Sequence, residues 1–156
     1  MVQVERELLK LAVQRPALCG PDFDALEAGA FTAPAHVAVR ELIAGNGGVA
    51  AAEGGDGAAW AARLREAAPG EDARAFVTRL AVEPLRLNAE PDARYAGAVL
   101  ARVGELAVSR QITAMKSRLQ RLNPVEGQAG YNRIFGDLVA LEQRRKALWE
   151  RAVGAL

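Results

Sequence analysis

Apolar residues recur at helical spacing through most of the first eighty residues. The first such segment predicts a helix over 4–14, which should end at Arg15 because the following proline disfavours the α conformation there. The stretch 50–57 is rich in glycine and alanine, and we interpret it as a mobile loop. The same spacing predicts four further elements: a short helix from Phe23 that Asp22 caps, and helices over 34–44, 58–67 and 71–82.

The longest predicted element runs from Asp92 to Asn123, a stretch without proline and with only two glycines. Roughly 30 helical residues at 1.5 Å per residue make a rod of about 45–50 Å. Its apolar stripe changes register partway, so we expect its two halves to face different surfaces. The first stripe contains Val99, Val103 and Leu106, and the second contains Val108, Ile112, Met115, Leu119 and Leu122.

The last predicted helix carries a seam at alternating spacings of three and four residues, interrupted by Arg145. Two such stripes joined by a loop over 125–130 predict an antiparallel helical hairpin. The predicted fold is therefore all-α. It has a helical bundle subdomain over 1–105, then a long helix and a C-terminal helical hairpin subdomain over 106–156, whose first arm continues the long helix. The seam positions are Tyr131, Ile134, Leu138, Leu141, Arg145, Leu148 and Ala152.

Composition supports this fold and limits where the chain can act. Hydrophobic residues make up 51% of the chain but aromatic residues only 5%, so the core consists of Ala, Leu and Val, which favour helices over sheets. No apolar stretch is long enough to span a bilayer, and the N-terminus does not resemble a signal peptide. A single cysteine, Cys19, excludes an internal disulfide, and we expect a cytoplasmic location. The net charge is −4 over 1–105 and +5 over 106–156.

Residue types typical of catalysis do not converge anywhere in the sequence. The single histidine, His36, has no partner at metal-ligand spacing, and we interpret it as a surface or half-buried helical residue. Cys19 is expected to be buried and structural. The glycine-rich stretches lack the Lys-Ser/Thr of a phosphate-binding loop, and acidic pairs such as Asp22 and Asp24 are explained by helix capping. We therefore expect no cofactor, no metal and no enzymatic activity.

The basic hairpin leaves alternatives open. Its cations could bind nucleic acid by releasing counterions, but they are spread over both helices and lack an aromatic stacking platform. They could equally form a solvated face or a surface that binds a partner protein, with Tyr131, Phe135 and Trp149 as anchors. The cations are Arg110, Lys116, Arg118, Arg121, Arg133, Arg144, Arg145, Lys146 and Arg151.

Several segments are similar to one protein family. The runs over 5–12, 16–18 and 31–35, and the later runs over 117–124 and 138–145, resemble the C-terminal domain of bacterial DnaG-type primase. The resemblance covers nearly the whole chain except 45–57, and its motifs are apolar patterns rather than catalytic signatures. It implies a helical bundle followed by a helical hairpin that docks onto the N-terminal region of the hexameric replicative helicase, DnaB, while the bundle modulates the helicase.

The resemblance also implies which residues dock and what is missing. The zinc ribbon and acidic metal-binding core of a primase are absent, so the chain is expected to be a non-catalytic fragment of a nucleotidyltransferase. Some family members also bind the acidic tail of single-stranded DNA-binding protein, although the sequence does not place that site. The N-terminal domain of the replicative helicase itself has a similar fold and is the alternative. The implied docking residues are Tyr131, Arg133, Ile134, Phe135, Leu138, Arg144, Arg145, Leu148, Trp149 and Val153.

Overall fold

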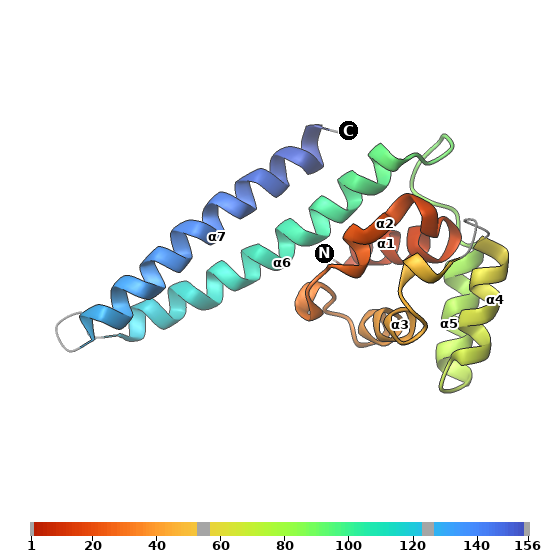
Figure 1. Ribbon diagram of the computed structural model, residues 1–156, viewed down its shortest axis with the longest axis horizontal. Helices are drawn as coiled ribbons and strands as arrows, with labels where there is room; N and C mark the ends of the chain where they lie inside the picture. The colour runs from red at the N-terminus through yellow and green to blue at the C-terminus, as the bar shows by residue number, and fades with distance from the viewer. Residues whose placement is uncertain (1, 53–56, 123–126, 155–156) are drawn as a thin grey trace.

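A computed structural model describes residues 2–52, 57–122 and 127–154 of the chain. Within these residues the structure is helical and contains no strand, which confirms the predicted all-α fold. Figure 1 shows a bundle of short helices beside one long antiparallel hairpin. The elements are α1 (Val2–Gln14), α2 (Pro16–Asp24), η1 (Ala28–Ala30), α3 (Pro34–Gly45), η2 (Val49–Ala51), α4 (Gly57–Ala67), α5 (Glu71–Val82), α6 (Ala93–Arg121) and α7 (Gln128–Gly154).

Helices α1, α3, α4, α5 and α6 begin and end within two residues of the predicted bounds. The prediction for α2 was wrong, because this helix begins at Pro16 instead of Phe23. Its N-cap residue is Arg15, so Asp22 is not the N-cap. Proline is accommodated in a first turn, where its missing N–H costs no hydrogen bond. Gly20, at φ 58° and ψ −161°, kinks α2 midway. Helix α7 also starts inside the segment predicted as a loop. Residues 53–56 and 125–126 of the two predicted loops, and Asn123 at the predicted end of the long helix, lie outside the described residues.

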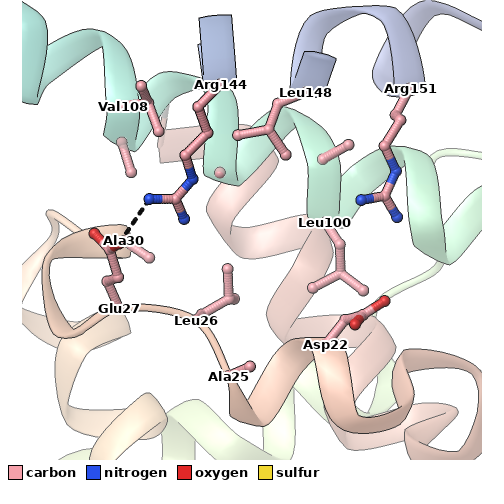
Figure 2. Close-up of a pocket in the computed structure, with 13 residues that line it drawn as sticks. Asp22, Ala25, Leu26, Glu27, Ala30, Leu100, Val108, Arg144, Leu148 and Arg151 are labelled. Atoms are coloured by element: carbon pink, nitrogen blue, oxygen red, sulfur yellow. Dashed lines mark hydrogen bonds and ion pairs between the residues drawn. The ribbon is translucent and has the colours of Figure 1, made fainter. Parts of the chain in front are cut away.

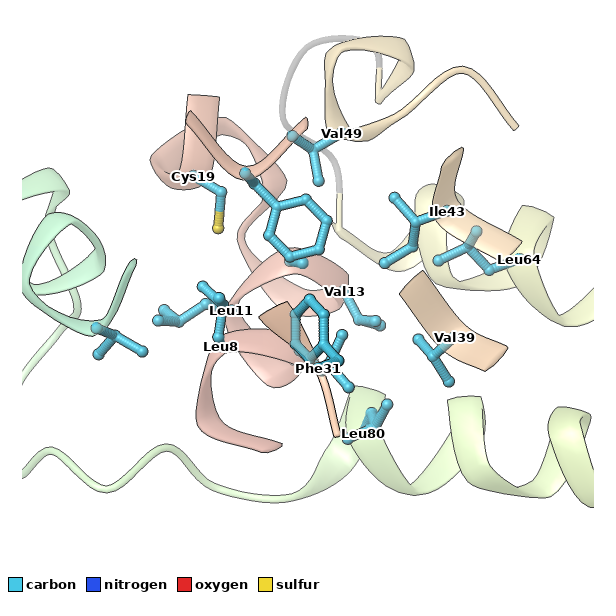
Figure 3. Packing of buried hydrophobic residues seen from close by; sticks show 14 of the residues in the cluster. Leu8, Leu11, Val13, Cys19, Phe31, Val39, Ile43, Val49, Leu64 and Leu80 are labelled. Atoms are coloured by element: carbon cyan, nitrogen blue, oxygen red, sulfur yellow. The ribbon is translucent and has the colours of Figure 1, made fainter. Parts of the chain in front are cut away.

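Helix α1 lies at the centre of the bundle and packs against every helix from α2 to α6. Its Leu8, Leu9 and Leu11 are fully buried, because apolar residues occupy more than one face of the helix. Figure 3 shows α1 side chains meeting residues of α3, α4 and α5 in one cluster. Trp60 of α4 extends this core, and its indole N–H donates to the carbonyl oxygen of Ala12 at 3.0 Å.

Buried polar groups tie α1 to its neighbours. Glu5 is 1% exposed, and its carboxylate accepts hydrogen bonds from the N–H of Thr32 at 2.8 Å and from the Thr32 hydroxyl at 2.6 Å. His36 of α3 lies 3.2 Å from the same carboxylate and is only 3% exposed, so its predicted surface or half-buried position was wrong. The cause is Glu5, which offers an imidazole a buried acceptor that the spacing around His36 cannot reveal.

Close approaches explain two glycines at segment ends. Gly48 has φ 74°, and a Cβ there would overlap the Asp24 carboxylate, which accepts the Val49 N–H at 2.9 Å. A Cβ at Gly57 would collide with the carbonyl oxygen of Gln14. A larger residue at Gly57 would therefore push α4 away from α1, and one at Gly48 would displace the Asp24 carboxylate and strain the backbone at its positive φ.

Helix α6 connects the bundle to the hairpin without interruption. Its N-terminus is capped by Asp92, whose side chain accepts the Tyr95 N–H at 2.8 Å. Val99 and Val103 belong to the bundle core, whereas Val108 and Ile112 pack with Leu138 of α7. The change of stripe predicted from the sequence is therefore present, and its two halves face different surfaces. The division into subdomains over 1–105 and 106–156 remains a prediction, since α6 runs straight through that boundary.

Candidate docking surface

One face of α7 forms the hairpin by packing along α6. Ile134 and Leu138 are buried, and Tyr131 and Leu148 are partly buried. Leu148 packs over Gly104 of α6. A Cβ added at Gly104 would lie 3.5 Å from Leu148 Cδ1, which is an ordinary van der Waals contact. The four predicted docking residues on this inner face therefore give most of their apolar surface to the hairpin itself.

A second stripe on α7 stays open to solvent. Phe135, Val139, Trp149 and Val153 are 52%, 44%, 49% and 47% exposed. Only two other large apolar side chains among the described residues are as exposed, Val2 and Val82, and neither lies on α7. Large apolar side chains that line one face of a helix and remain in water typically mark an interaction site.

Sequence reasoning named Phe135, Trp149 and Val153 but missed Val139. Val139 follows Phe135 by four residues and precedes Trp149 by ten, so the four positions share a heptad register that differs from the inner seam. This second register is present in the sequence. It was overlooked because the inner seam has more apolar positions and gives the stronger pattern.

Charged residues occupy the middle of the exposed stripe. In the same heptad register, Glu142 and Lys146 separate Val139 from Trp149. Glu142 lies 3.6 Å from Lys116 of α6 and 3.2 Å from Arg145, which interrupts the inner seam. Lys146 is exposed, and no ion pair within the described residues involves it. The apolar ends of the stripe therefore flank a charged centre.

The C-terminal end of the stripe borders a groove between α1, α6 and α7. Trp149 and Val153 form one wall, and Arg86 and Arg102 line the same groove. Glu7 also lines it and accepts the Arg86 N–H at 2.7 Å and the hydroxyl hydrogen of Tyr95. Burial and this carboxylate raise the pKa of Tyr95 well above its ordinary range, so its hydroxyl remains a donor.

A polar clasp holds the other side of the hairpin against the bundle. Figure 2 shows Arg144 of α7 reaching Glu27, and the two side chains lie 3.0 Å apart. Gln111 of α6 donates to the same carboxylate at 2.6 Å, and Arg110 donates to the carbonyl oxygen of Gly29 at 2.7 Å. The hydrogen bond from Arg144, with that from Gln111, lowers the pKa of Glu27. We name Glu27, Arg110, Gln111 and Arg144 the clasp.

The clasp changes how two predictions are interpreted. Arg144 was predicted to dock a partner, and the structure places it in a contact with the bundle. Together with Lys116, Arg145 and Arg110, it also belongs to the hairpin cations that already contact carboxylate or carbonyl oxygens. The positive surface available to nucleic acid is correspondingly smaller than the sequence indicates. Arg133 is exposed on α7 and lies next to the inner seam in sequence.

No arrangement typical of catalysis emerges from the described parts of the chain. Among residues 2–52, 57–122 and 127–154, no group of three or more His, Cys, Asp or Glu side chains could hold a metal ion. None of the helices formed by these residues combines the length and hydrophobicity needed to cross a bilayer.

Comparison with known families matches residues 5–134 to the model described as DNA primase DnaG DnaB-binding. The chain belongs to this family. Membership selects the primase domain over the alternative, the helicase's own N-terminal domain. DNA primase of Mycobacterium tuberculosis is 43% identical over 150 residues, which cover 96% of this chain and 23% of that protein. DNA primase of Streptomyces coelicolor is 44% identical over 157 residues, or 97% of this chain and 24% of that protein.

A solved structure has the same fold. The helicase binding domain of primase from Mycobacterium tuberculosis superposes with a TM-score of 0.79 and 41% identity, covering 99% of this chain and 95% of that one. This DnaB-binding domain thus spans about a quarter of the length of the curated primases it matches.

Proposed function

We propose that this domain is a non-catalytic docking module that binds the N-terminal region of the replicative helicase DnaB through the exposed stripe of α7. The observation that carries the proposal is that stripe, Phe135, Val139, Trp149 and Val153, in a member of a family described by DnaB binding. The related solved domain from Mycobacterium tuberculosis, described as helicase-binding, supports the same partner. Docking in the cytoplasm would bring primer synthesis to the moving helicase and modulate the primosome.

The shape of the stripe favours a helical partner. Phe135 and Val153 are separated by five turns of α7, or about 27 Å at 1.5 Å per residue. Heptad spacing lets a second helix lie along this length with its own apolar side chains between those of α7. Phe135 and Trp149 are the strongest candidates for anchors, because aromatic side chains bury much area at little entropic cost.

The other implied docking residues contribute differently in this proposal. Leu138 and Leu148 would support α7 from beneath, because they pack in one cluster with residues of α6, and Ile134 is buried on the same face of α7. Arg144 would set the position of α7 through the clasp. Arg133, near the start of α7, is exposed and remains available at the edge of the surface, whereas Tyr131 is partly buried on the inner face. Binding of a single-stranded DNA-binding protein tail remains a prediction without an assigned site.

We further propose that the chain acts as part of a DNA primase. Its curated relatives are DNA primases about four times its length, so primer synthesis would belong to other parts of such a protein. The domain itself would need no cofactor for docking.

Calorimetry against the purified DnaB N-terminal region tests the proposal. Truncating Trp149 or Phe135 to alanine should weaken binding about 10- to 30-fold each, as expected for aromatic anchors worth about 1.5–2 kcal/mol. Val82→Ala is the matched control, because Val82 is 74% exposed at the end of α5, away from α7. Equal loss in all three variants, or no binding by the intact domain, would refute docking through α7.

A salt titration separates this function from nucleic-acid binding. A basic module would bind DNA with an affinity that falls steeply with salt, because each phosphate contact releases counterions. We expect weak DNA binding, since the clasp and Glu142 already engage several hairpin cations. Tight, salt-sensitive binding that Arg118→Ala and Arg133→Ala abolish would favour the basic-module alternative.

A further inference from the structure

The exposed stripe of α7 has a symmetry that a one-sided docking surface does not need. Its six positions lie at spacings of four, three, four, three and four residues, and they are symmetric about residue 144. Their chemistry follows the same symmetry, with apolar residues in the two outer pairs and opposite charges in the central pair. In chain order the stripe is Phe135, Val139, Glu142, Lys146, Trp149 and Val153.

We propose that a second copy of this chain occupies the stripe, with the two α7 helices antiparallel about a two-fold axis that passes between Glu142 and Lys146. This arrangement places Glu142 opposite the partner's Lys146 and, by symmetry, Lys146 opposite the partner's Glu142. A two-fold interface uses the same patch on both subunits and must therefore be self-complementary. The central charges of the stripe meet that requirement.

The apolar residues pair in the same register. Val139 faces the partner's Trp149, and Phe135 faces the partner's Val153, so each end of the interface buries an aromatic ring against an aliphatic side chain. In a parallel pairing Glu142 would instead face a second Glu142, and Lys146 a second Lys146. Like charges repel and favour the antiparallel arrangement.

The surroundings of the stripe leave room for a second helix. Figure 1 shows α7 on the opposite side of α6 from α3, α4 and α5, and Phe135, Val139, Trp149 and Val153 are each about half exposed. Only the C-terminal end of the stripe borders the groove with α1. Of the exposed residues that directly follow a stripe position, Gly136, Ala140 and Ala147 are small, whereas Gln143 and Glu150 are long and polar.

Self-pairing would cover the surface proposed for the helicase. The pairing does not rest on the proposed function, because it concerns two copies of this chain alone. If both hold, the free domain shields its own apolar stripe, and the helicase must displace one copy to dock. Apparent affinity for the helicase would then fall as the concentration of the domain rises, because the competent form is diluted by dimers.

Charge reversals at the central pair test the proposal. In sedimentation equilibrium from about 5 to about 500 µM, the wild-type chain should shift from monomer to dimer, a range typical of weak helix pairing. Lys146→Glu should weaken dimerisation on the order of tenfold, because two attractive pairs become repulsive. Lys146 is the better first target, since Glu142 also contacts Lys116 and Arg145 within its own chain.

A mixture of two variants with complementary charges provides the second test. Glu142→Lys alone should also be mostly monomeric, but an equal mixture with Lys146→Glu should form a heterodimer, because every facing pair is then opposite in charge. Circular dichroism checks that both variants keep their helices. Tryptophan emission gives a second readout, since Trp149 is half exposed and should shift to the blue on pairing, whereas Trp60 is already buried.

Each outcome bears on the proposal. A wild-type chain that stays monomeric throughout, or single variants that dimerise as well as the wild type, would overturn it. A mixture that fails to associate while the wild type does would exclude the antiparallel register. None of these results affects helicase binding by the monomer, so failure of the pairing is distinguishable from failure of the docking function.

Discussion

Replacing Glu5 tests whether one buried carboxylate holds α1 against the start of α3. Both of its oxygens are engaged: Oε1 accepts the Thr32 N–H and lies near His36, and Oε2 accepts the Thr32 hydroxyl. Glu5 is 1% exposed, so water cannot reach its position to replace the lost carboxylate as a hydrogen-bond acceptor for His36. We expect Glu5→Ala to be among the most destabilising single changes in the bundle.

The magnitude follows from what each partner loses. His36 is buried, and leaving its ring nitrogen without a partner should cost about 1–2 kcal/mol. Thr32 is exposed, so water can replace Glu5 there, and its two hydrogen bonds should cost about 0.5 kcal/mol each. The vacated volume adds about 1 kcal/mol. The free energy of unfolding should therefore fall by about 3 kcal/mol, which lowers Tm by about 10 °C in a chain of this size.

The same group should make stability depend on pH. Burial raises the pKa of Glu5, but hydrogen bonds from Thr32 and His36 outweigh it and leave the pKa below its ordinary value of 4.5. A carboxyl with a lowered folded-state pKa stabilises the fold above its unfolded pKa, and this contribution is lost as pH falls through the folded pKa. Urea unfolding at about pH 7, 5, 4 and 3 should show wild type losing stability faster than Glu5→Gln below about pH 4.5. Parallel pH profiles, or a loss under about 1 kcal/mol for Glu5→Ala, would refute this reasoning.

Three further predictions follow from other sites. Gly97→Ala and Gly136→Ala should each raise the free energy of unfolding by about 0.5–1 kcal/mol in urea titrations, because a Cβ meets open space at both helical positions. Cys19 should react with a thiol reagent only when the chain unfolds, since burial raises its pKa to about 12; labelling of the native chain within minutes would contradict this. Glu27→Gln should cost about 0.5–1 kcal/mol and speed hydrogen exchange in α7, and Arg144→Gln should add little to it if the two act as one contact.

Local signals in the sequence predicted most of the fold. Helix bounds came from features that act within a few residues, such as Pro34 in a first turn and Pro16 directly after the end of α1. Hairpin formation came from heptad spacing, which is also local. The error at α2 shows where local rules conflict: Pro16 and Gly20-Pro21 both carry boundary signals, and only packing against α1 decides that Pro16 starts a helix.

The surface of the hairpin was harder to predict, because it depends on contacts between distant segments. Spacing could not separate residues that hold α7 to α6, such as Leu138, from residues that remain exposed, such as Phe135. Both kinds are apolar and recur at intervals of three and four. The difference becomes clear only when α6 is placed beside one register, leaving the other in water.

Arg144 illustrates why charge counts mislead in the same region. In the sequence, Arg144 is one cation in a basic run, and such a run is consistent with binding a partner protein, binding nucleic acid or facing solvent. Its partner carboxylate belongs to Glu27, which lies 117 positions away in the chain, between α2 and η1. The contact couples the position of α7 to the bundle, so the bundle can influence docking without touching the partner. If that coupling operates, Glu27→Gln should weaken helicase binding although Glu27 lies outside the exposed stripe, and the control Val82→Ala should not.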